Sequence, residues 1–219
     1  MSQRKIAIVG GTGAEGSGLA LRWGRAGHQV IIGSRDPAKA KALADEFNAK
    51  LGTQMLAGMT SDAAVDLADI VVLTVPYSSQ LDMVRALSGK LQGKILVDVT
   101  VPLVPPKVSQ VQLPLSGSCV VAVQKELGDN VRVVSAFQNV SAHKLKDLEY
   151  KIDCDVLVCS NDKDARHIVI GLAKDAGLRG IDAGALANST VAESLTSALI
   201  WINRTYKIPD AGILITGIS

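Results

Sequence analysis

The stretch I-A-I-V-G-G-T-G-A-E-G, at residues 6–16, decides the fold. Four apolar residues run directly into a glycine cluster, and a helical pattern follows at once, so we expect a buried strand, a tight turn and the start of a helix. Gly11, Gly13 and Gly16 fit the spacing G-x-G-x-x-G. In this motif the first glycine permits the turn, the second lets backbone approach a pyrophosphate, and the third lets the helix pack on the strand. The stretch therefore predicts dinucleotide binding rather than a bland structural turn.

Strands alternate with helices along most of the chain. Apolar runs predict further strands at residues 30–33, 54–57, 70–75, 94–99 and 131–136, and helical patterns lie at 14–26, 37–48, 61–67, 80–87 and 118–127. This alternation predicts an α/β fold, a doubly wound parallel sheet of the Rossmann type with helices on both faces. We predict an NADP-binding domain at residues 1–137. Residues 138–219 would form a small C-terminal helical and strand extension, with strands at 154–159 and 180–183 and helices at 162–176 and 188–203.

Composition narrows the class of protein. The 219 residues are 47% hydrophobic and carry a net charge of +2, so a full core is expected and no basic stripe for nucleic acid. No apolar run is long enough for a membrane span, and the polar residues 1–5 lead directly into a strand, which predicts no signal peptide. Cys119, Cys154 and Cys159 are odd in number and lack C-x-x-C spacing, so we expect neither disulfides nor zinc, and a cytoplasmic location.

Two segments depart from the alternation. Residues 100–117 contain four prolines, which predicts a long loop over the ligand edge of the sheet. Residues 211–218 are unusually apolar and need a cover, for which a second subunit is the simplest candidate. We therefore expect a homodimer.

The end of the second strand distinguishes NADP from NAD. An NAD site usually places an acid there, whereas an NADP site places small and basic residues. Ser34 can donate to a 2′-phosphate, Arg35 can bind it in bidentate fashion, and Lys39 adds a charge one helical turn later. Asp36 could pass as the NAD acid, but Pro37 marks it as a helix cap. NADP is favoured, the alternative being that the basic residues are solvated surface charges.

Residues suited to proton transfer are few. None of Tyr77, Tyr150 and Tyr206 is followed four residues later by Lys, so the short-chain dehydrogenase pair is absent. An alcohol or ketone substrate needs a nearby proton donor. Direct hydride passage between two cofactors needs mainly stacking, distance and exclusion of water, and the chain fits this scheme better. We predict no catalytic side chain.

The remaining histidines and carboxylates receive structural interpretations. We expect His28 to be a surface cap residue after the first helix, and His167 to be structural. His143, at the sheet edge, is a weaker candidate for touching a ligand. Asp153 and Asp155 flank Cys154 in alternation, which favours an exposed strand edge over a metal site.

Several stretches together resemble one family. They are G-G-T-G-A-E-G-S-G-L-A-L-R-W at 10–23, G-S-R-D-P-A-K at 33–39, L-T-V-P-Y at 73–77, V-S-A-F-Q-N-V-S-A at 134–142 and D-A-G-A-L-A-N-S-T-V-A-E-S-L-T at 182–196. In this set the chain is similar to the NADPH-dependent coenzyme F420 reductase family, over nearly its whole length. The first block is generic to Rossmann proteins and the last is specific. The resemblance implies hydride transfer between NADP and a 5-deazaflavin, usually in a homodimer.

The resemblance also implies contact residues for both small molecules. The pyrophosphate turn would use Thr12, Gly13, Ala14 and Glu15, and the 2′-phosphate grip Ser34, Arg35 and Lys39. The ribose and nicotinamide would lie beside Val75, Pro76, Ser79 and Val101, and the two rings would meet at Gln138, Val140 and Ala142. The deazaflavin would have polar contacts from Asn188, Ser189 and Thr196.

Departures from the family leave alternatives open. Gln138 stands where related sequences can carry His, and Ala185 and Ala187 stand where Pro and Ser occur. The last predicted helix can also be explained without a ligand, with Asn188 as its N-cap and Glu193 near the first turn. Two other functions fit the fingerprint. One is an NADPH-dependent reductase of an imine, a ketone or a metal complex, and the other is a non-catalytic NADP-sensing protein.

Overall fold

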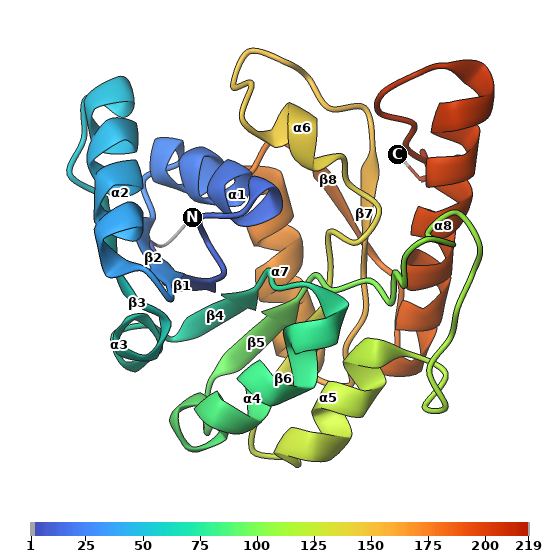
Figure 1. Cartoon of the computed structure of the whole chain (residues 1–219), viewed down its shortest axis with the longest axis horizontal. Coiled ribbons are helices and arrows are strands. Elements are labelled where there is room, and N and C mark those ends of the chain that lie inside the picture. The colour runs from blue at the N-terminus through green and yellow to red at the C-terminus, as the bar shows by residue number, and fades with distance from the viewer. Residues whose placement is uncertain (1–2, 219) are drawn as a thin grey trace.

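The computed structural model describes residues 3–218 and contains one large parallel sheet (Figure 1). Met1, Ser2 and Ser219 lie outside the described residues, so the predicted polar start at 1–5 is only partly covered. The sheet has the order β3-β2-β1-β4-β5-β6, and every pairing in it is parallel. Its strands are β1 (Lys5–Val9), β2 (Gln29–Ser34), β3 (Leu56–Thr60), β4 (Ile70–Leu73), β5 (Ile95–Asp98) and β6 (Arg132–Ser135). The predicted doubly wound α/β fold is confirmed.

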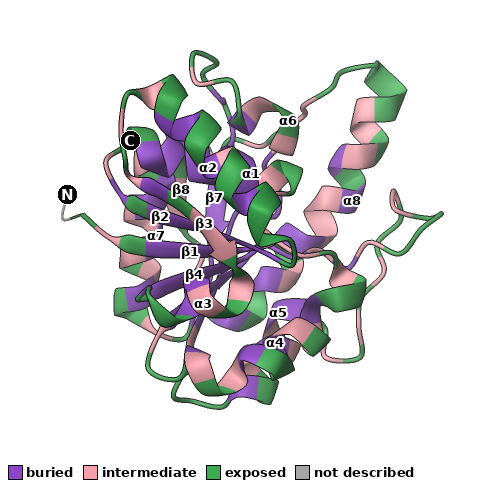
Figure 2. Cartoon of the chain, turned by 60° about the vertical axis from the view of Figure 1, so that its left-hand side comes forward, coloured by how far each residue is buried: buried purple, intermediate pink, exposed green. Residues whose placement is uncertain are grey.

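Helices cover both faces of this sheet. The connecting helices are α1 (Ala14–Arg25), α2 (Pro37–Leu51), α3 (Ser61–Asp66), α4 (Tyr77–Leu91) and α5 (Cys119–Leu127). In β1, Ile6 and Ile8 belong to the core under α1 and α2, whereas Ala7 and Val9 belong to the core under α3, α4 and α5. A strand buried on both faces has no polar alternation, and the central strands β1 and β4 are buried apart from Lys5 at the start of β1 (Figure 2).

The C-terminal part forms a smaller parallel pair of strands beside the main sheet. It contains α6 (Ala142–Leu145), β7 (Asp155–Val158), α7 (Lys163–Asp175), β8 (Arg179–Asp182), a 3₁₀ turn (Leu186–Asn188) and α8 (Ser189–Tyr206). An antiparallel bridge between Ser135 and Cys159 links the two sheets. Residues of α7 share a hydrophobic core with α1, so the core crosses residue 137. No helix among residues 3–218 is long and apolar enough to cross a bilayer.

Two side chains of α1 fasten it to the C-terminal part. The indole N–H of Trp23 donates to the Leu172 carbonyl at 2.9 Å. The buried Arg22 guanidinium donates to the carbonyls of Leu145 at 2.7 Å and Ala176 at 2.9 Å. Burial lowers the pKa of Arg22, and these carbonyls provide acceptors for its N–H groups. The helix that opens at the glycine-rich turn is thereby held from both parts of the chain.

Two of the structural interpretations made from the sequence are wrong. Asp155 does not lie on an exposed edge: it is fully buried, with Arg179 Nε and Nη2 each 2.7 Å from one of its carboxylate oxygens. These bonds from Arg179 hold the pKa of Asp155 below its usual value. Asp155 also binds the apolar tail at residues 211–218. Its N–H donates to the Ile213 carbonyl, and its carboxylate accepts from the Ile215 N–H, so the tail lies partly against its own chain.

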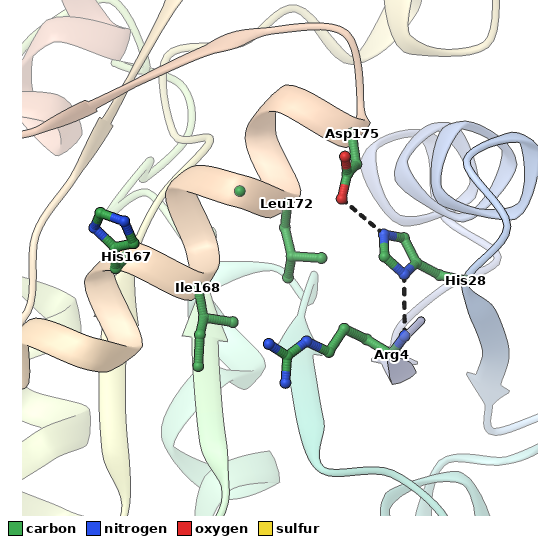
Figure 3. A pocket seen from close by; sticks show the side chains of 7 residues that line it. Arg4, His28, His167, Ile168, Leu172 and Asp175 are labelled. Atoms are coloured by element: carbon green, nitrogen blue, oxygen red, sulfur yellow. Dashed lines mark hydrogen bonds and ion pairs between the residues drawn. The ribbon is translucent and has the colours of Figure 1, made fainter. Parts of the chain in front are cut away.

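The second incorrect interpretation concerns His28, which is buried and does not cap a helix at the surface. Its Nε2 lies 3.0 Å from Asp175 Oδ2, and its Nδ1 accepts from the Arg4 N–H at 3.2 Å (Figure 3). An acceptor role at Nδ1 assigns the proton of a neutral ring to Nε2, which then donates to Asp175. This hollow also includes His167, Ile168 and Leu172 of α7. Because Arg4 and His28 directly precede β1 and β2, the hollow lies at the amino ends of the strands.

Candidate functional site

The glycine-rich turn joins β1 to α1 through close backbone contacts. The left-handed φ of +79° belongs to Gly10. At Gly11 a Cβ would lie 2.8 Å from the Ile8 carbonyl oxygen, which accepts from the Gly11 N–H within the turn, so this glycine permits the tight turn as predicted. At Gly16 a Cβ would lie 2.6 Å from Thr74 Oγ1, which confirms that this glycine allows the helix to pack on the sheet.

The N-terminus of α1 is open to a ligand. Its N-cap, Gly13, has no side chain to accept from the first backbone N–H groups. Among residues 3–218, no acceptor satisfies the N–H groups of Thr12, Ala14 or Glu15. Free donors at the positive end of a helix bind anions, and a nucleotide pyrophosphate fits this chemistry. A Cβ at Gly13 would have only the Gly10 carbonyl oxygen as a neighbour within 4 Å beyond the adjoining residues, at 3.3 Å.

The end of β2 places a basic group beside this turn. Asp36 caps α2 by accepting from the Lys39 N–H at 3.1 Å, which confirms the predicted helix cap. Ser34 Oγ accepts from the Asp36 N–H and keeps its own proton available for donation. Within the described chain, neither Arg35 nor Lys39 takes part in an ion pair. Two unpaired cations and a hydroxyl suit a 2′-phosphate.

One cleft brings many of the predicted residues together at the carboxyl ends of β1, β2 and β4. Seven predicted residues line it: Thr12, Gly13, Ser34, Arg35, Val75, Pro76 and Ser79. The sequence interpretation missed four further lining residues: Gly10, Ser61, Thr74 and Met83. Ser61 could have been found, because β3 pairs in register with β2 and α3 begins directly after it. We refer to these eleven residues as the nucleotide cleft.

The other predicted contacts lie around this cleft rather than in its lining. Ala14 and Glu15 form the first turn of α1, Lys39 lies in the first turn of α2, and Val101 follows β5. Gln138 and Val140 are buried in the segment after β6, and Ala142 begins α6. Thr196 of α8 joins this segment, because its hydroxyl donates to the Gln138 carbonyl at 2.9 Å.

The side chains of Ser189 and Asn188, at the start of α8, make hydrogen bonds to other parts of the chain. Ser189 is fully buried, and its hydroxyl lies 2.7 Å from that of Ser118. Asn188 is the N-cap residue of α8, as the explanation without a ligand predicts, but its side chain makes no cap bond and donates instead to the Ala183 carbonyl.

Asp98 is a buried junction beneath the site. Its Oδ1 accepts from the Thr100 N–H at 2.9 Å, and its Oδ2 accepts from Gln80 Nε2 at 2.6 Å. Its backbone carbonyl accepts from Gln138 Nε2 at 2.8 Å. Burial raises the pKa of Asp98 to about 6, against the lowering effect of its hydrogen bonds. One residue thus fixes the start of α4, the loop after β5 and the segment after β6.

Comparison with known proteins gives relatives over nearly the full length. Residues 5–102 match the family described as "NADP oxidoreductase coenzyme F420-dependent". An F420-dependent NADP reductase of Methanocaldococcus jannaschii is 40% identical, covering 98% of this chain and 99% of its own. The enzyme of that name from Methanothermobacter marburgensis is 39% identical, with coverage of 98% and 99%. The crystal structure of a candidate F420-dependent NADP-reductase from Arthrobacter sp. FB24 is 25% identical with a TM-score of 0.80, covering 97% and 99%.

Proposed function

The chain belongs to the coenzyme F420-dependent NADP oxidoreductase family, and on this premise we propose that it transfers hydride reversibly between C4 of the nicotinamide of NADP(H) and C5 of the deazaflavin F420. The observation that carries the proposal is the nucleotide cleft. It combines an open helix N-terminus with Ser34 and Arg35 at the rim of a doubly wound sheet. In such folds, ligands bind outside the carboxyl ends of the strands.

The NADP half of the proposal rests on the fit of the residues present. The unpaired N–H groups at the start of α1 would hold the pyrophosphate, and Ser34, Arg35 and Lys39 the 2′-phosphate. Val75, Pro76 and Ser79 would border the ribose and nicotinamide, together with Val101 from the loop after β5. The side chain of Asp36 is occupied in capping α2, which removes the acid that an NAD site would require.

The deazaflavin half rests on the segment after β6. Gln138, Val140 and Ala142 follow the strand next to β5, and Thr196 fastens this segment to α8. We infer that the deazaflavin lies against this segment, with Asn188 and Thr196 on the α8 side. Ser189, whose hydroxyl is buried against Ser118, would support α8 and make no contact with the deazaflavin. Residues 138–219 would thus complete the second site.

The chain's part in the reaction would be to position the two bound rings. Hydride passes between two bound rings, which supply the reactive carbons themselves. The chain's residues would hold these rings in contact and keep water out, and no side chain would form a covalent bond.

We also infer a homodimer in the cytoplasm. Exposed apolar side chains lie on α8 and on the loop after β5, and they would be buried by a second copy of the chain. They include Val191 and Trp201 on α8, and Leu113 and Leu115 on the loop. All three cysteines are free thiols, as a reducing compartment would keep them.

The test is to mix the protein with NADPH and oxidised F420 and to follow the visible absorbance of the deazaflavin. Loss of this absorbance supports the proposal. Binding of NADPH without bleaching would overturn it. Turnover of a panel of imines, ketones and metal complexes would then distinguish a different reductase from a non-catalytic NADP-binding protein.

A further inference from the structure

One oxygen of the Glu15 carboxyl group, Oε1, is shielded from solvent without a hydrogen-bond partner among the described residues. Glu15 lies in the first turn of α1, directly after the glycine-rich turn, where the pyrophosphate of the proposed substrate would bind. The residue as a whole is only partly buried. An ionised oxygen that is shielded from water and has no partner costs more free energy than the neutral acid in the same place. Burial, with no other cause, raises the pKa of Glu15 to about 8.

The direction of the Glu15 side chain follows from the face of α1 on which it lies. Residues 15, 18 and 22 follow one another along a helix face at intervals of three and four. At Gly18 a Cβ would run into Leu145 of α6, and Arg22 donates to the Leu145 carbonyl. This face of α1 is therefore turned towards α6, which lies beside it in Figure 1. Glu15 lies at the end of this face nearest the nucleotide cleft.

No cation compensates the charge of Glu15. Titratable and charged groups on the elements around α1 include His143 and Lys144 on α6, Arg35 after β2, Lys39 in the first turn of α2, and Lys174 and Asp175 at the end of α7. Within residues 3–218, none of them forms an ion pair with Glu15, and none contributes to its raised pKa. The positive end of α1 favours a carboxylate at this position, but a bound pyrophosphate would offset that field.

We propose that Glu15 carries a proton while the dinucleotide is bound, so that NADP(H) binding in alkaline solution takes up a proton from solvent. This inference rests on the proposed use of NADP(H). A bound pyrophosphate adds negative charge beside Glu15 and therefore favours its protonated form. In that form Glu15 can donate a hydrogen bond to the dinucleotide, which an ionised carboxylate cannot do. Glu15 is thus a positioning residue that couples affinity for the dinucleotide to pH.

The test measures the Kd of NADPH between pH 7 and 9.5, for the wild-type chain and for Glu15→Gln. In this range the 2′-phosphate is fully ionised, since its second pKa is about 6, and lysines are still charged, since their pKa is about 10.4. We expect the wild-type Kd to approach a tenfold rise per pH unit above pH 8, and to be about 30-fold higher at pH 9.5 than at pH 7. The Glu15→Gln curve should stay flat within about twofold. Glu149→Gln, which alters an exposed acid far from the cleft, should follow the wild-type curve.

Parallel curves for the wild type and Glu15→Gln would overturn the inference. If Glu15→Gln does not fold, calorimetry on the wild type decides alone. At pH 8.5, binding in two buffers of different ionisation enthalpy should reveal uptake of about 0.7 proton per site, and uptake near zero would contradict the inference. Failure of the proposed function is distinguishable, because it would appear as absence of NADPH binding or of F420 bleaching at pH 7. If F420 is bleached and the two Kd curves run parallel, the proposed function stands and only the role of Glu15 is refuted.

Discussion

Glu193 of α8 accepts a hydrogen bond at 2.9 Å from the backbone N–H of Cys119, the first residue of α5. Its other oxygen accepts from the Ser118 hydroxyl at 2.6 Å and from the Val120 N–H at 3.3 Å. A buried carboxylate thus satisfies the start of a helix 73 to 75 residues away in sequence, where the helix dipole stabilises its charge. This contact fixes α8 against the main sheet.

We expect Glu193→Gln to lower the free energy of unfolding by about 1–3 kcal/mol, because an amide group would turn a donor towards one of the three donors now bound by the carboxylate. Urea unfolding measures the change. The matched control is Glu126→Gln, which removes a surface ion pair with Arg85 and should cost less than about 1 kcal/mol. Equal losses in the two variants would contradict the capping role.

Gly16→Ala should disturb both stability and nucleotide binding. Its Cβ would lie 2.6 Å from Thr74 Oγ1 and 2.8 Å from Gly11 Cα, so α1 must move away from the glycine-rich turn. We expect a loss of about 1–3 kcal/mol in stability and at least a tenfold higher Kd for NADPH, measured by thermal unfolding and by NADPH fluorescence. Gly89→Ala, in the open interior of α4, should instead be neutral or stabilising by up to about 1 kcal/mol. Unchanged NADPH binding in Gly16→Ala would speak against this packing.

Arg35→Ala should separate NADPH from NADH. Loss of a charge-assisted contact with the 2′-phosphate is worth about 1.5–3 kcal/mol, or about 10- to 150-fold in Kd for NADPH. The Kd for NADH should change less than about twofold. Lys41→Ala removes a cation that is already paired with Asp45 on the same helix, and it should leave both affinities unchanged. Equal losses for the two dinucleotides in Arg35→Ala would place the 2′-phosphate elsewhere.

The raised pKa of Glu15 also predicts how stability depends on pH. The folded chain holds this proton up to about pH 8, while the unfolded chain releases it near its ordinary value of 4.5. Between these values the folded state binds more protons, so the free energy of unfolding falls as pH rises from about 4.5 to 8. Without ligand, Glu15→Gln should therefore be more stable than the wild type at pH 8 by at least about 1 kcal/mol, and nearly equal at pH 4.5. Chemical denaturation at both pH values measures this, and an equal difference at the two would refute it.

The main sheet and the phosphate turn were predictable from the sequence because their signals are local. An apolar run, a glycine cluster and the cap at Asp36 act within a few residues of one another, and the structure confirms the strand, helix and cap that they indicate. The left-handed residue of the turn is Gly10, which directly precedes the three glycines of the motif and was not predicted to adopt that conformation. The four-residue α6 is too short to produce a helical period.

The errors concern charges whose partners lie far away in the chain. His28 is buried because Asp175, 147 residues later, accepts its N–H, and Asp155 is buried because Arg179 binds it from the neighbouring strand. A sequence window around either residue contains only the polar group and not its partner. The sequence analysis missed Thr74 and Met83 for a related reason. These two residues line the nucleotide cleft only because β4 pairs with β1, which a local sequence window does not show.

Deuterium transfer is the most direct test of the account. NADPH labelled with deuterium at C4, in each of its two stereochemical forms, is oxidised by the enzyme with F420 in ordinary water. If hydride passes directly between two rings held in one cleft, one of the two forms should deliver its deuterium to C5 of the reduced deazaflavin, as mass spectrometry would show. Turnover with the deuterium lost to solvent from both forms, or no turnover at all, would contradict the central claim.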